Sequence, residues 1–209
     1  MAMLNPTVTR AEIVERMTHD EFMEFAPEDR KAELIEGVMI VASPAFEPHE
    51  DLFGFLFAVL RSFTSQLKLG RVLGSRYAVY ISETETYEPD ILFVAADRAH
   101  LITEKKLTGA PDLVIEILSA GTARFDRGVK RENYDRAGVR ELWLIDPYGP
   151  AGTQFYQRRE GRLVEIAPVD GIINSVAIPG FKLNIAWLWP KEGGELPSPI
   201  AVLKELGVI

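Results

Sequence analysis

The sequence predicts an α/β (α+β) protein in which helices flank a mixed central sheet, and two observations carry that prediction. Two short apolar runs, residues 113–118 and 141–146, enclose a polar stretch of helical character at 124–137. This is the order of a strand, a crossover helix and a parallel strand. Residues 49–69 place apolar side chains at helical spacing, which predicts a long amphipathic helix against the sheet.

Composition limits the class of protein. The chain has 209 residues, 47% hydrophobic and 26% charged, so one domain with a sizeable core is expected over residues 1–209. It contains no cysteine, which excludes a disulfide framework and a thiolate metal site. Its net charge of −8 argues against a broad basic surface that coats nucleic acid, although a local basic face remains open.

Neither a signal peptide nor a membrane span is expected. Arg10, Glu12, Glu15 and Arg16 interrupt any apolar core near the N-terminus. The longest apolar stretches, such as residues 53–60, are far shorter than the roughly 20 residues of a spanning helix. We therefore expect a cytoplasmic protein without a membrane partner.

The N-terminal elements are predicted by local signals. Residues 1–17 are expected to form a loose segment. Thr18 and Glu21 have capping-box spacing, which predicts a short helix that ends near Pro27. Residues 31–42 read as two strands joined by a turn at Glu36-Gly37.

The elements that follow are predicted from periodicity and from turn residues. They are a helix over 49–69 stopped by Gly70, strands over 71–82 and 87–95 separated by polar residues 83–86, a strand over 113–118, a helix over 124–137 stopped by Gly138, a strand over 141–146, a hairpin of 153–157 with 163–167, an edge strand and loop over 176–189, and a helix over 199–206 within a C-terminal extension, 190–209.

Glu116 is the anomaly of the chain. It stands alone in the apolar run 113–118, where both strand parities are apolar and burial on both faces is expected. A buried carboxylate costs several kcal/mol unless it is paired, protonated or bound to a cation. Two alternatives stay open: an edge strand that exposes Glu116, and a structural ion pair with Lys130 or an arginine.

Three further residues belong with Glu116. Asp90 follows Pro89 at the start of an apolar strand, Lys130 lies on the predicted helix, and Glu33 lies near the first strand. Neighbouring carboxylates repel unless a cation lies between them, and oxygen ligands with room for water suit Mg²⁺ or Mn²⁺. A metal ion, carboxylates and a lysine together suit phosphodiester hydrolysis.

These residues resemble one family. The segments Glu33-Leu34-Ile35-Glu36-Gly37, Ser43-Pro44 followed by His49, Pro89-Asp90 and the whole stretch 111–147 are similar to the Uma-two family of bacterial proteins. That family is assigned to the restriction-endonuclease-like PD-(D/E)XK superfamily. The resemblance implies a restriction-endonuclease-like domain with additional N-terminal and C-terminal strands.

The resemblance also implies roles for single residues. Asp90 and Glu116 would be the metal-binding carboxylates, with Glu33 as an additional acidic residue. Leu118 stands where the superfamily motif has lysine, and the resemblance implies that Lys130 supplies the amine instead. It places His49 near the cleft, where a helix cap or a solvated position is the alternative. Tyr134, one turn beyond Lys130, either lines the same cleft or packs in the core.

Two classes of function follow. The first is a divalent-metal-dependent endonuclease that hydrolyses DNA, acts as a homodimer and uses Lys130 to position or activate water. The second is a catalytically silent nuclease fold that binds nucleic acid or a protein partner, which the displaced lysine and the acidic charge favour. Hydrolysis of another phosphate ester would use the same site. Lys130 could also lie on a solvated helix face with Asp126, Glu132 and Asp135.

Overall fold

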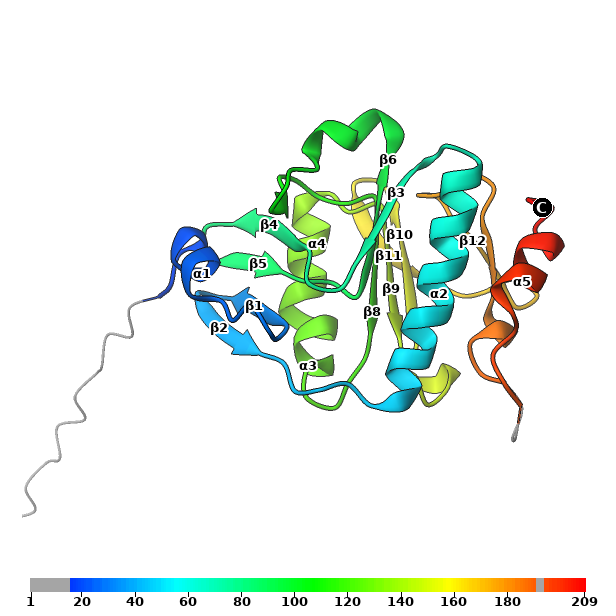
Figure 1. Cartoon of the computed structure of the whole chain (residues 1–209), viewed down its shortest axis with the longest axis horizontal. Coiled ribbons are helices and arrows are strands. Elements are labelled where there is room, and N and C mark those ends of the chain that lie inside the picture. Colours follow the sequence, from blue (N-terminus) through cyan, green and yellow to red (C-terminus); the bar gives the residue numbers. More distant parts are fainter. Residues whose placement is uncertain (1–15, 191–193) are drawn as a thin grey trace, which may run out of the picture.

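A six-stranded mixed sheet forms the centre of the computed structural model, which describes residues 16–190 and 194–209 (Figure 1). The strand order is β11-β10-β9-β8-β6-β3. β8 and β9 are parallel, and the other neighbouring pairs are antiparallel. The strands are β3 (Gly70–Gly74), β6 (Ile91–Ala95), β8 (Leu113–Ile117), β9 (Glu141–Ile145), β10 (Gln154–Arg159) and β11 (Arg162–Ile166).

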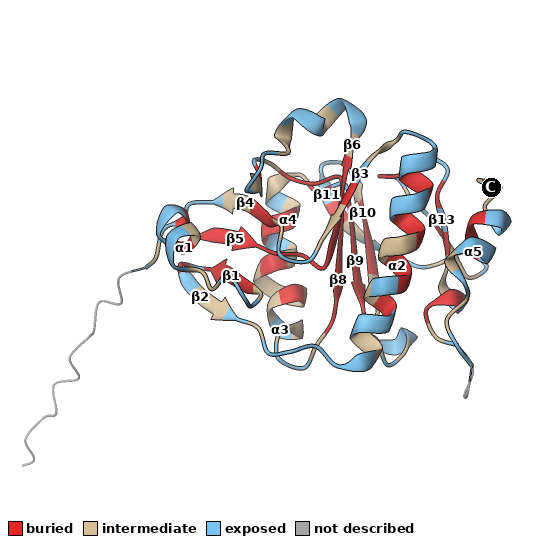
Figure 2. Ribbon diagram, viewed as in Figure 1, coloured by how far each residue is buried: buried red, intermediate tan, exposed pale blue. Residues whose placement is uncertain are grey.

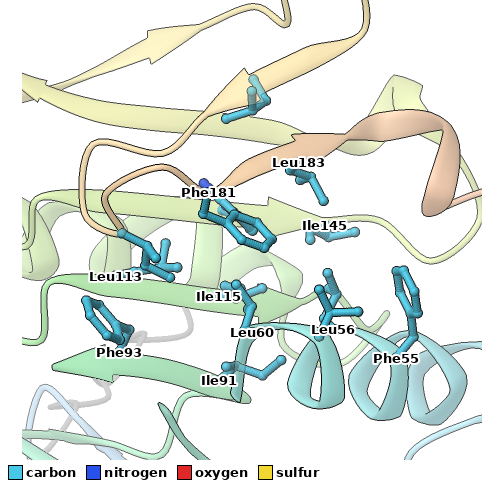
Figure 3. Close-up of a cluster of buried hydrophobic side chains, with 14 of the residues drawn as sticks. Phe55, Leu56, Leu60, Ile91, Phe93, Leu113, Ile115, Ile145, Phe181 and Leu183 are labelled. Carbon is cyan, nitrogen blue, oxygen red and sulfur yellow. The ribbon is translucent and has the colours of Figure 1, made fainter. Parts of the chain in front are cut away.

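The two faces of this sheet are covered by different helices (Figure 1). Helix α2 (Glu47–Gln66) lies against one face, where Leu56 and Leu60 meet Ile115 and Ile145 of the sheet (Figure 3). The connection from β8 to β9 covers the other face as α3 (Ala123–Phe125), a π-helical turn η2 (Asp126–Lys130) and α4 (Arg131–Ala137). The predicted parallel crossover is therefore confirmed.

Burial is greatest in the central strands (Figure 2). All five residues of β8 and all five of β9 are buried, although they include Glu116 and Glu141. Alternate side chains of β8 enter different clusters: Ile115 packs with α2, and Val114 packs with Tyr134 of α4. Glu116 has the parity of Val114, so it faces the α3–α4 side.

A second sheet of five strands lies beside the first, in the order β2-β1-β5-β4-β7. Its strands are β1 (Ala32–Ile35), β2 (Val38–Val41), β4 (Ala78–Ser82), β5 (Glu85–Tyr87) and β7 (Lys106–Leu107). The β1–β2 turn places Glu36 at φ 51° and Gly37 at φ 75°, as a two-residue hairpin of type I′ requires. Helix α1 (His19–Phe25) begins with the predicted capping box of Thr18 and Glu21.

The C-terminal part adds a small hairpin and a helix. Strands β12 (Ile172–Asn174) and β13 (Lys182–Asn184) pair with each other, and α5 (Pro199–Glu205) packs against α2. Three 3₁₀ turns complete the elements: η1 (Ala96–Leu101), η3 (Pro150–Gly152) and η4 (Ile185–Trp187). Residues 1–15 of the predicted loose segment 1–17 lie outside the described residues. Within the described ranges, no helix combines the length and apolar character that a membrane crossing needs.

Several predicted boundaries are wrong. Helix α2 begins at Glu47 and ends at Gln66, and Lys68, at φ 55°, takes the left-handed conformation expected of Gly70. Gly70 instead starts β3, where a Cβ would collide with the carbonyl oxygen of Val94. The predicted strand 71–82 divides into β3 and β4, because these two segments pair in different sheets.

Other elements were predicted only in part. The polar residues 83–86 were expected to separate strands, but Glu85 and Thr86 belong to β5. The edge strand expected over 176–189 is limited to β13, which pairs with β12. Helix 124–137 ends at Gly138 as predicted, with φ 93°, but it is not regular, because Gly128 departs from helical angles in the π turn.

Candidate active site

Asp90 directly precedes β6, and Glu116 lies in β8, the strand beside β6. Ile91 pairs with Ile115 in the antiparallel β6–β8 ladder, and the same register sets Asp90 across from Glu116. The backbone N–H of Ile117 donates to Asp90 Oδ2 at 2.7 Å, which holds that carboxylate against β8. Because β8 lies between β6 and β9, the alternative of an exposed edge strand is wrong.

Lys130 joins three carboxylates that are far apart in the sequence. Its Nζ lies 2.8 Å from an oxygen of each of Glu33, Glu116 and Asp126. These come from β1, β8 and the π turn. The Lys130 side chain is 1% exposed, so the alternative of a solvated helix face is wrong for Lys130 and for its neighbour Asp126. An ion pair of Glu116 with Lys130 is present.

Asp126 and Lys130 form an i, i+4 ion pair within the π turn. This spacing brings two side chains near each other on a regular helix. Here Gly128, at φ −101° and ψ −111°, breaks the regular helix between them. π turns of this kind recur at functional sites in helices.

Asp90 is held by cations on its solvent side. Lys31 Nζ lies 2.7 Å from Asp90 Oδ1, and His49 Nε2 lies 3.3 Å from Asp90 Oδ2. His49 is in the first turn of α2, which brings its ring beside Asp90. Lys31 was not among the predicted residues. Its position two residues before Glu33, on the same face of an extended segment, was the signal that could have identified it.

Tyr134 completes the buried part of the site. Its hydroxyl donates to Glu116 Oε1 at 2.8 Å, and its ring packs edge-on against Tyr87 at 5.3 Å between centroids. Lys130 Nζ lies 5.5 Å from the centroid of the Tyr87 ring. Tyr134 therefore both fills the core and contacts the site, so the two alternatives for this residue hold together.

The pKa values of Glu116 and Lys130 are both raised, but for different reasons. Burial raises the pKa of Glu116 to about 8, because the opposing attraction of Lys130 is weaker and Asp126 adds repulsion. For Lys130, burial alone would lower the pKa, but Asp126, Glu116 and Glu33 outweigh it and raise the pKa well above its usual value. Lys130 is therefore charged throughout the physiological range.

The pKa values of Asp90, Lys31 and His49 are each shifted in the direction that favours the charged form. Burial would raise the pKa of Asp90, but Lys31 and His49 together hold it well below its usual range. Burial would likewise lower the pKa of Lys31, and the carboxylates of Asp90, Glu116 and Glu33 raise it instead. Asp90 also raises the pKa of His49 against the effect of burial.

The donor set fits a hard divalent cation. Four carboxylates, namely Glu33, Asp90, Glu116 and Asp126, contact two lysines, and His49 also contacts Asp90, so the acidic groups outnumber the lysines. Among residues 16–190 and 194–209, no three histidine or acidic side chains converge as ligands of one ion. Mg²⁺ is often held by only one or two carboxylates and keeps several of its waters, so Asp90 and Glu116 are the residues that would hold it here.

Known proteins resemble this chain in sequence and in fold. The sequence profile of the Uma2 family, described as "Putative restriction endonuclease", matches residues 19–186. A crystal structure of "a putative nuclease belonging to DUF820" from Anabaena variabilis superimposes with a TM-score of 0.67 and 20% sequence identity. The match covers 82% of this chain and 97% of that chain. No curated protein matches the sequence.

The structural match shows the fold, a restriction-endonuclease-like mixed sheet flanked by helices. The family match covers most of the chain and includes Glu33 in β1, Asp90 just before β6, Glu116 in β8 and Lys130 in the π turn. This protein belongs to the Uma2 family of restriction-endonuclease-like proteins.

Proposed function

We propose that this protein is a divalent-metal-dependent endonuclease that hydrolyses phosphodiester bonds of DNA. One observation carries the proposal: the β6–β8 register sets Asp90 across from Glu116, in a cluster whose carboxylates outnumber its lysines. A Mg²⁺ or Mn²⁺ ion held by these two residues would neutralise the excess charge, polarise a phosphate and activate a water. The family description supports a nuclease.

The residues of the chain have separate tasks in this proposal. Asp90 and Glu116 would hold the ion, and Lys130 would fix Glu116 and Glu33 in place through its contacts of 2.8 Å. In hydrolysis, a water oxygen bonds to phosphorus and one P–O ester bond breaks. The departing oxygen then takes up a proton, which leaves an alcohol and a phosphate monoester.

The direct test is cleavage of plasmid and single-stranded DNA with Mg²⁺ or Mn²⁺. The wild type should cut, and Glu116→Ala and Asp90→Asn should lose about 10²-fold or more of the rate, the size typical for loss of a group that stabilises the transition state. Lys182→Met, on β13 of the C-terminal hairpin, is a matched control and should cut at the wild-type rate. Cleavage that survives Glu116→Ala would overturn the proposal.

A catalytically silent protein that binds nucleic acid or a protein partner is the second candidate. The contacts of the lysines favour it: Lys130 is enclosed by three carboxylates, and Lys31 neutralises Asp90. Mn²⁺ titration by calorimetry separates the candidates, because a silent site that is neutralised internally would bind no ion at millimolar Mn²⁺.

Two further predictions concern the oligomeric state and the location of the protein. A homodimer would present two sites to the two strands of a duplex, and light scattering on the purified protein measures the oligomeric state. The cytoplasmic location expected from the sequence stays a prediction, which fractionation of cells would check.

A further inference from the structure

The site contains two lysines, and they differ sharply in their access to solvent. The side chain of Lys31 is 24% exposed, whereas that of Lys130 is 1% exposed. Among the side chains that form the ion pairs of the site, those of Asp90, Glu33, Glu116 and Asp126 are exposed by 6% or less, and that of His49 by 16%. Lys31 is therefore the most accessible of the basic side chains that contact these carboxylates, and a phosphodiester that enters from solvent meets it before Lys130.

The backbone fixes Lys31 at the rim of the site. Its carbonyl accepts a hydrogen bond of 2.9 Å from Ala42, at the end of the β1–β2 hairpin. The next residue, Ala32, donates to the buried carboxylate of Glu88 at 3.3 Å. Anchored on both sides, Lys31 directs its side chain to Asp90 from outside the buried cluster.

The ammonium group of Lys130, in contrast, is enclosed by protein. Its ammonium group makes ion pairs with three buried carboxylates and lies near the face of Tyr87, so its hydrogen-bonding capacity is used within the protein. Contact with a substrate would require it to give up ion pairs in a buried environment, which is costly. Lys31 has a single ion-pair partner, Asp90, and can use its remaining donors outward.

We infer that Lys31 is the lysine that contacts a non-bridging oxygen of the substrate phosphate, and that Lys130 is a positioning residue. This inference rests on the proposed function for the class of substrate, a phosphodiester of DNA. An ammonium group at this place would attract the phosphate on approach and stabilise the additional negative charge of the transition state. The lysine of the motif is thus replaced by two lysines with separate tasks.

The test measures DNA binding and cleavage separately. Binding of a short fluorescent DNA duplex is followed by anisotropy over a series of salt concentrations, in EDTA and in Ca²⁺, for the wild type and for Lys31→Met, Lys31→Arg, Lys130→Met and Lys182→Met. Loss of one lysine–phosphate contact lowers the slope of log K against log salt by about one. Cleavage rates are then measured with Mg²⁺, and thermal melting shows which variants are folded.

Lys31→Met should lower the salt slope by about one and the cleavage rate by about 100-fold. Lys31→Arg, which keeps the charge, should retain the slope, and Lys182→Met should match the wild type in every measurement. Lys130→Met should lower the melting temperature and leave the salt slope unchanged. If Lys31→Met does not fold, Lys31→Gln replaces it in the same comparison with Lys31→Arg.

The outcomes distinguish this inference from the proposed function. A wild type that binds DNA but does not cut, with a lower slope for Lys31→Met, would overturn the nuclease and support the contact. Equal slopes for the wild type, Lys31→Met and Lys31→Arg would overturn the contact, whether or not the protein cuts. A wild type that binds no DNA would overturn both.

Discussion

Lys130 Nζ lies 2.8 Å from Glu116 Oε1, and both side chains are almost completely buried. The lysine comes from a π turn and the carboxylate from the middle strand of the central sheet. The pair helps to explain how an acidic residue is tolerated in an apolar strand, because Lys130 and the Tyr134 hydroxyl both contact its carboxyl group. Two more carboxylates share the same lysine, so one positive charge serves three acidic groups.

Replacing Lys130 should destabilise the protein. Lys130→Met would leave Glu33, Glu116 and Asp126 buried without their shared cation, and breaking a buried ion pair costs about 3–5 kcal/mol. Urea unfolding at neutral pH measures the free energy of unfolding. Lys182→Met is the control, and a loss below about 1 kcal/mol for Lys130→Met would contradict a structural role for this lysine.

The buried carboxyl of Glu116 should make stability fall as the pH rises. Burial raises its pKa from the ordinary 4.5 to about 8, so the folded protein keeps a proton that the unfolded chain has lost between these values. The stability that this carboxyl contributes is present below about pH 4.5 and is lost as the pH rises toward 8.

Glu116→Gln has no proton to lose at this position. Without metal, the melting temperature of Glu116→Gln should therefore rise relative to that of the wild type as the pH is raised from 4.5 to about 8. A difference in melting temperature that is the same at both ends would mean that Glu116 ionises normally in the folded protein.

His19 should make stability fall as the pH falls, which is opposite to the effect of Glu116. Burial lowers its pKa below 6.5, and Lys106, whose Nζ lies 2.5 Å from His19 Nε2, lowers it further. As the pH falls below 6.5, the unfolded chain takes up a proton that the folded protein refuses, so stability is lost on acidification. His19→Gln should reduce this loss in melting curves below pH 6.5. His100→Gln, at an exposed position on η1, should show the same loss of stability on acidification as the wild type. If His19→Gln and His100→Gln lose equal stability, His19 is not the cause.

Local signals in the sequence were sufficient for much of the fold. The capping box of α1, the Glu36-Gly37 turn and the β8–β9 crossover each depend on residues close together in the chain, and each is confirmed. The apolar run around Glu116 also predicted its burial correctly, because apolar residues on both strand parities require protein on both faces.

The parts that sequence patterns missed depend on distant partners. Lys31 meets Asp90 across 59 positions, and Lys130 meets Glu33 across 97, so no local period relates them. The assembly of β1, β2, β4, β5 and β7 into a separate sheet also joins segments from distant parts of the chain. The π turn was not predicted from the sequence, because the charged residues around it are typical of a solvated helix face. In the structure, Asp126 and Lys130 are buried.

Anomalous density from a crystal soaked in Mn²⁺ would reveal whether Asp90 and Glu116 bind a metal ion. We expect one ion between the carboxylates of Asp90 and Glu116 in the wild type, and no ion there in Asp90→Asn. An empty site at millimolar Mn²⁺, or an ion bound elsewhere on the protein, would contradict this expectation.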